Sequence, residues 1–117
     1  MSQRLYKAKA DHNGDWVFGY YLEVGGVPYI LPEGKPLNAI VQVRPETVCQ
    51  EIGMVDDYGV KVFEGDILAD KSGNTGAVSF GWFSGLRSFY CYGSLTYLTD
   101  RDLIVIRNIH DEEQIND

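Results

Sequence analysis

The chain has 117 residues, of which 44% are hydrophobic and 13% aromatic. This composition excludes a disordered chain, because burying so much apolar surface offsets the entropy lost on folding, and the length fits one compact domain. The net charge of −7 disfavours nucleic acid and anionic membranes as partners. No apolar run in the sequence reaches the roughly 18 residues of a membrane span or resembles a secretory leader, so we expect a soluble, cytoplasmic protein.

The first 43 residues predict a three-stranded antiparallel meander and one further strand. Turn signals separate the extended runs, with Asn13-Gly14 in the first turn and Gly25-Gly26 in the second. The predicted strands are 5–9, 16–22, 27–31 and 39–43.

Prolines mark three positions in this part of the chain. Pro28 has no amide to donate, so its strand should lie at a sheet edge or begin there. The loop at 32–36 has a proline at each end and should be exposed. Pro45 should start a single helical turn at 45–48, because proline is tolerated at the first helical position.

The segment 56–68 carries the strongest turn signals. Asp56-Asp57-Tyr58-Gly59 places acceptor side chains before a residue that tolerates positive φ, which predicts a tight reversal. Val60 and Val62 should then share one face of a short strand. Gly65 permits a bulge, after which the chain is extended again and Ile67 points inward.

The rest of the chain predicts further strands. A turn at 73–76 precedes paired strands at 75–82 and 88–92 around a loop at Ser84-Gly85, and the last strand is 103–106. The segment 94–98 fits either a helical turn or a strand, and the acidic tail 111–117 should be solvated.

The block Gly59-Val60-Lys61-Val62-Phe63-Glu64-Gly65-Asp66-Ile67-Leu68, with 104–110 closing the chain, resembles the YopX family of phage and prophage proteins. The lead-in 44–48, with Gln50 and Gly53, resembles that family too. Arg107 stands where the family usually has glycine, and Val60-Lys61 replaces a lysine-glutamate pair. The family-motif positions are Gly59, Phe63, Glu64, Gly65, Asp66, Ile67 and Asn108.

The resemblance implies an all-β protein encoded by mobile genetic elements, acting in a bacterial host cell, with no activity established for the family. We expect one YopX-like domain over 1–117. It would consist of a small SH3-like barrel, built mainly from 44–117, with the meander of 1–43 packed on it as a second β subdomain.

Four carboxylates are the candidates for chemistry. Asp56, Asp57, Glu64 and Asp66 could together bind a divalent cation for a metal-assisted hydrolase, if their side chains converged. The favoured alternative is that they cap turns by accepting backbone amides. We therefore expect no metal, no cofactor and no catalytic residue.

The histidines and cysteines carry no recognisable motif. His12 should lie in a turn. Neither His12 nor His110 stands at a zinc-binding spacing from a cysteine. Cys49 and Cys91 should be reduced, buried thiols, and a Cys-His nucleophilic pair has no supporting signature.

Aromatic residues alternate along two predicted strands. Trp16, Phe18 and Tyr20 should share one face of the second strand, and Tyr90 and Tyr92 should lie opposite Phe89 and Cys91. These faces are core or else contact a partner. The candidates for partner contact are Trp16, Tyr20, Trp82, Tyr90 and Tyr92.

The leading hypothesis is a non-enzymatic protein-binding or assembly module that self-associates into a homo-oligomer through exposed strand edges or aromatic patches and contacts host or phage proteins. The second is a small β barrel that binds single-stranded nucleic acid through its aromatic faces, against the net charge. The third is the metal-assisted hydrolase.

Overall fold

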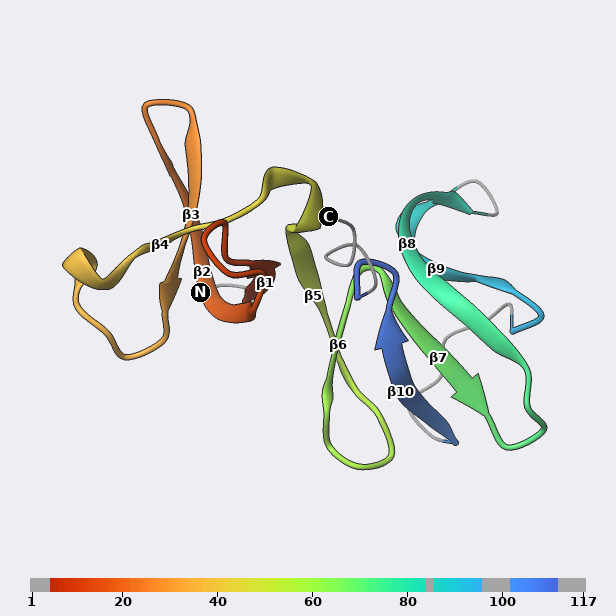
Figure 1. The fold of residues 1–117 in the computed structure, drawn as a ribbon. Coiled ribbons are helices and arrows are strands. Elements are labelled where there is room, and N and C mark those ends of the chain that lie inside the picture. The colour runs from red at the N-terminus through yellow and green to blue at the C-terminus, as the bar shows by residue number, and fades with distance from the viewer. Residues whose placement is uncertain (1–4, 84–85, 96–101, 112–117) are drawn as a thin grey trace. The chain divides into compact units, whose positions relative to one another are not determined.

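The structure is a computed structural model that describes residues 5–83, 86–95 and 102–111, with the backbone alone at 82–83 and 86–88. The chain divides into two compact units, residues 1–51 and 52–117. The regular structure described is β-strand apart from two short 3-10 turns, so the predicted all-β class is confirmed (Figure 1).

The first unit is built around the predicted meander. β1 pairs with β2, β2 pairs with β3, and β3 pairs with the short β4, all antiparallel. Its core contains Ala8, Ile30 and Val43. The elements are β1 (Tyr6–Lys9), β2 (Trp16–Val24), β3 (Val27–Pro32), η1 (Leu37–Ala39), β4 (Val41–Gln42) and η2 (Pro45–Thr47).

The meander strands, their turns and the helical turn at Pro45 are confirmed, but the strand predicted at 39–43 is wrong in extent. Ala39 donates its N–H to the carbonyl of Pro36 at 2.9 Å, which closes a 3-10 turn and leaves two residues for β4. Pro28 is the second residue of β3, and strand pairing with β4 begins only at Tyr29.

Close approach of two strands explains Gly19 in β2. A Cβ at this position would lie 2.1 Å from the carbonyl oxygen of Leu31 in β3. No side chain fits there, so glycine is required for the β2–β3 pairing.

The second unit contains a four-stranded antiparallel sheet with the order β10-β7-β8-β9 (Figure 1). Its core contains Val62, Leu68, Val78, Cys91, Leu95 and Leu103. The chain enters through β5 (Cys49–Val55), whose first residues still pair with β1. The other strands are β6 (Lys61–Phe63), β7 (Asp66–Asp70), β8 (Thr75–Phe83), β9 (Leu86–Gly93) and β10 (Leu103–Asn108).

Three details of the 56–68 segment differ from the prediction. Val60 is 49% exposed, whereas Val62 is fully buried. The amide of Val60 binds the side chain of Asp56 and so still belongs to the turn at 56–60, called the aspartate turn below, and β6 begins only at Lys61. Ile67 is half-buried, and Leu68 occupies the core in its place. Gly65 lies in a tight turn between β6 and β7, with φ of +88°, and not in a bulge within a strand.

The expected SH3-like barrel is not confirmed. Both sheets are open in their strand order, one from β4 to β6 and the other from β10 to β9. The paired strands β8 and β9 and the strand β10 lie where they were predicted, and the loop predicted at Ser84-Gly85 lies outside the described residues. Residues 96–98 of the ambiguous segment and 112–117 of the acidic tail lie outside the described residues.

Candidate functional site

The side chain of Asp56 binds three backbone amides. Its Oδ1 accepts hydrogen bonds from the N–H groups of Tyr58 and Val60, both at 2.9 Å. Its Oδ2 accepts one from Val105 in β10 at 3.0 Å. Burial raises the pKa of this carboxyl, but the hydrogen bonds from Val105, Val60 and Tyr58 prevail, and the pKa lies below its usual value.

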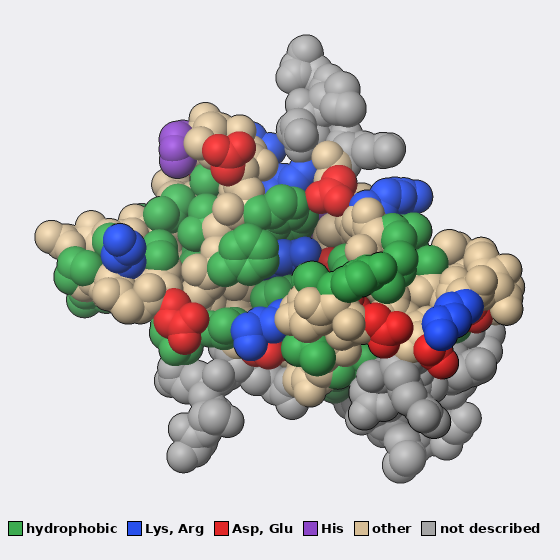
Figure 2. Space-filling view, turned by 90° about the horizontal axis from the view of Figure 1, so that it is seen from below, with side chains coloured by type: hydrophobic (Ala, Val, Ile, Leu, Met, Phe, Trp, Pro, Cys, Tyr) green, Lys and Arg blue, Asp and Glu red, His purple; other side chains and the backbone are tan. Residues whose placement is uncertain are grey.

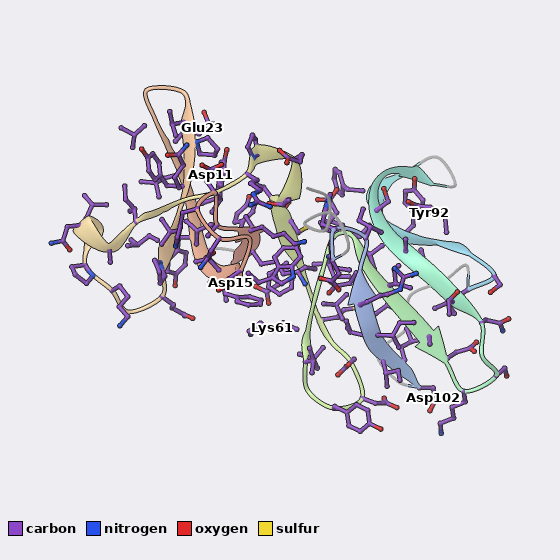
Figure 3. The ribbon with its side chains drawn as sticks, viewed as in Figure 1. Asp11, Asp15, Glu23, Lys61, Tyr92 and Asp102 are labelled. Atoms are coloured by element: carbon purple, nitrogen blue, oxygen red, sulfur yellow. The ribbon has the colours of Figure 1, made fainter. Side chains whose placement is uncertain are left out.

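The neighbouring Asp57 holds the beginning of β10. Its N–H donates to the carbonyl of Leu103 at 2.9 Å, and its Oδ1 accepts the N–H of Asp102 at 2.9 Å. Figure 3 labels Asp102 at this end of the strand. Because β7 pairs with the opposite side of β10, the aspartate turn covers the outer edge of β10.

A second carboxylate joins β7 to the end of β10. Asp66, which is 1% exposed, accepts the N–H of Phe63 through Oδ2 at 2.8 Å and the side-chain amide of Asn108 through Oδ1 at 2.9 Å. Asn108 in turn accepts the N–H of His110 at 2.9 Å. A Cβ at Gly65 would lie 3.2 Å from Nδ2 of Asn108, so the glycine leaves room for this contact. These family-motif residues act together as a structural clamp.

The four candidate metal ligands therefore divide by role. Asp56 and Asp66 bind amides through both oxygens, and Asp57 binds one through Oδ1. Glu64 is half-buried in the turn before β7. Among the described residues, no group of three or more histidine, cysteine, aspartate and glutamate side chains could hold a metal ion.

Cys49 and Cys91 form no disulfide and are both buried, as predicted. Burial raises the pKa of the Cys91 thiol to about 11, so the reactive thiolate is scarce at neutral pH. Cys49 donates its S–H to the carbonyl of Thr47 at 3.2 Å. His12 lies exposed in the first turn, as expected.

The two aromatic candidates of the first unit, Trp16 and Tyr20, contact charged side chains. The Nζ atoms of Lys7 and Lys9 lie 4.7 Å and 5.5 Å from the ring centre of Trp16. Trp16 and Tyr20 are half-buried, and the Tyr20 hydroxyl donates to Glu33 at 3.4 Å. The ring of Trp16 thus stabilises two buried lysine side chains.

The tyrosines of β9 lie on the face of the four-stranded sheet opposite its core. Tyr92 is 53% exposed, and its ring centre lies 6.3 Å from that of the half-buried Tyr90 (Figure 3). Cys91, between them, belongs to the core. The backbone of Trp82 lies in β8, and its side chain is outside the described residues.

The strand β9 differs from the strands at the other sheet ends. It spans Leu86–Gly93, contains no proline and a single charged residue, Arg87, and pairs within its sheet only with β8 as far as the structure describes the chain. The other ends are β4 with two residues, β6 with three, and β10, whose edge the aspartate turn covers. Natural proteins shorten or cover strand edges in these ways to prevent pairing with other chains. β9 is therefore the candidate interaction edge.

The hydrogen bonds of β8 fix the direction of the backbone groups of β9. The carbonyl of Val78 accepts the N–H of Gly65 at 2.8 Å, so it points away from β9. Val78 lies opposite Cys91 in the register. In an antiparallel sheet, the backbone N–H and C=O groups of two directly opposite residues point either toward each other or away from each other. Because those of Val78 point away from β9, the N–H and C=O of Cys91 point away from β8 and face the open edge. The same holds for Arg87, four residues earlier. Tyr90 and Tyr92 bond toward β8.

Basic side chains are dispersed on the face seen in Figure 2, where they lie as separate spots among acidic and hydrophobic ones. No helix in the described part of the chain is long and apolar enough to cross a membrane.

The sequence pattern indicated the tyrosines of β9 and exposed strand edges in general, but not that β9 is the edge strand. Side-chain alternation reveals a strand and its two faces, whereas the number of neighbouring strands depends on the whole sheet. The available signal was a run of eight residues with one charge and no proline.

The strands and their hydrogen-bonded turns define a small all-β protein in which β9 is a sheet edge that no other described strand pairs with. Residues 27–114 match the family model described as YopX protein. The chain belongs to the YopX family. No curated protein matches it.

Proposed function

We propose that this protein is a non-enzymatic assembly module, encoded by a phage or prophage and acting in the cytoplasm of the bacterial host, that self-associates by strand addition at β9. The observation that supports the proposal most directly is the position of β9 at the end of its sheet. An edge strand of this length, which pairs only with β8 among the described residues, offers a row of backbone donors and acceptors to another strand.

The contrast with the other sheet ends supports this function. Covering the edge of β10 employs both Asp56 and Asp57, while β9 carries neither an internal lysine nor a proline. Tyr92 belongs to β9 and is 53% exposed, so it places an aromatic surface beside this edge. Tyrosine is enriched at protein interfaces, where its ring is buried and its hydroxyl stays solvated.

The roles of the carboxylates support the non-enzymatic part of the proposal. Asp56 and Asp66 are engaged by backbone and side-chain amides, which makes them structural acceptors. Binding of single-stranded nucleic acid stays an alternative, with the net charge of −7 against it.

Light scattering across the micromolar range tests the proposal with one variant at the edge. Arg87→Pro removes an N–H that faces the open edge and spares the bonds to β8. In a symmetric pair two hydrogen bonds are lost, at about 1 kcal/mol each, so we expect the Kd of self-association to rise about 30-fold.

The matched control is Arg87→Ala, which removes the same charge and keeps the N–H; its Kd should change less than about threefold. Both variants should keep the far-ultraviolet circular dichroism of the wild type. A wild-type protein that stays monomeric at all concentrations would refute the proposal.

A further inference from the structure

We infer that the occupant of the β9 edge is a second copy of this chain, paired antiparallel around a two-fold axis at Tyr90. This inference rests on the proposed function and specifies its partner. An antiparallel strand is its own hydrogen-bonding complement, because the same residues point outward on both copies.

The direction of the backbone selects the register. Every second residue of β9, counted from Cys91 in both directions, directs its backbone N–H and C=O toward the open edge. The first of these outward-facing residues is Arg87 and the last is Gly93. An axis at Tyr90 sets Arg87 of one copy opposite Gly93 of the other and uses every outward-facing position. Moving the axis by one residue in either direction leaves Arg87 or Gly93 without a counterpart on the other strand.

The charge of the strand favours the same arrangement. Arg87 is the one charged residue of β9. With the axis at Tyr90, the two Arg87 residues lie at opposite ends of the paired strands, about 20 Å apart at the usual rise per residue. A parallel, in-register pairing of two copies would bring the like charges together.

The tyrosines then meet on the outer face of the joined sheets. Tyr90 bonds toward β8, so Tyr90 of each copy occupies a non-hydrogen-bonded position across the axis, with Cα atoms about 4.5 Å apart. Tyr92 of one copy lies opposite position 88 of the other, and the two Tyr92 residues are about 14 Å apart.

Disulfide cross-linking distinguishes these positions. The Cα separation expected at Tyr90 suits a disulfide, whereas that at Tyr92 is too long. After mild oxidation with diamide, Tyr90→Cys should give at least tenfold more covalent dimer than Tyr92→Cys, as measured by non-reducing electrophoresis. The wild type reports the background from the buried Cys49 and Cys91.

A mixed pair gives an independent check if Tyr90→Cys does not fold. Ser88→Cys mixed with Tyr92→Cys should cross-link, while each variant alone should not. Equal cross-linking of Tyr90→Cys and Tyr92→Cys would contradict the inferred axis.

Light scattering on the wild type distinguishes a wrong register from the absence of self-association. Dimers without cross-linking at position 90 or in the mixed pair would overturn the register and leave self-association standing. A monomer would overturn both, and the edge would then be open to a strand of a different protein.

Discussion

Replacing Asp66 by alanine is expected to lower the free energy of unfolding by about 3 kcal/mol, because a buried amide of Phe63 and the side-chain amide of Asn108 lose their acceptor. Asn108→Ala should cost about 2 kcal/mol, since it also leaves the N–H of His110 without its acceptor. Urea unfolding followed by circular dichroism measures both changes.

The double variant tests whether the two side chains act as one clamp. Residues in direct contact show coupling energies of about 0.5–3 kcal/mol, so Asp66→Ala with Asn108→Ala should cost less than the sum of the single changes. Asp70→Ala is the matched control. Asp70 also lies on β7 and accepts hydrogen bonds from Ser72 and Asn74, but on an exposed turn where water can replace it, so its loss should cost clearly less than the loss of Asp66. Equal costs at Asp66 and Asp70 would contradict the clamp.

Asp56→Asn is expected to destabilise the protein by about 2–3 kcal/mol at pH 7, because a charged acceptor of three amides becomes a neutral one with a misplaced donor. The cost should depend on pH. The folded-state pKa of Asp56 lies below the usual value of an aspartate, so its ionised form contributes stability above that usual value. This contribution is lost as the pH falls through the folded-state pKa.

The difference in unfolding free energy between the wild type and Asp56→Asn should therefore be constant from pH 7 to about 5 and shrink below pH 4. Urea titrations at each pH measure it. Asp11→Asn changes an exposed aspartate of the first turn and serves as the control for the loss of one charge. A difference that grows on acidification would show that Asp56 is not held as an ionised acceptor.

Local sequence signals predicted much of the fold. The turns at Asn13-Gly14, Gly25-Gly26 and Asp56–Gly59 depend on side chains and φ preferences within a few residues, and all three lie where they were expected. Which side chains of β7 face the core was not predictable in this way. Asp66 turns inward to bind Asn108, 42 residues away, and this contact puts Leu68 and not Ile67 into the core.

The candidate site was predicted only in part. Turn chemistry correctly favoured acceptor roles for Asp56 and Asp66, but that Asp56 also covers the edge of β10 depends on a contact with Val105, 49 residues away. The open edge of β9 follows from the order of strands in a sheet, which only tertiary pairing decides.

Amide hydrogen exchange at increasing protein concentration reports directly on strand addition at β9. Self-association through β9 should slow exchange at Arg87 and Cys91, whose N–H groups face the open edge, by tenfold or more. The N–H groups of Tyr90 and Tyr92, which already bond toward β8, should change little. Exchange at Arg87 and Cys91 that is independent of concentration would contradict strand addition at this edge.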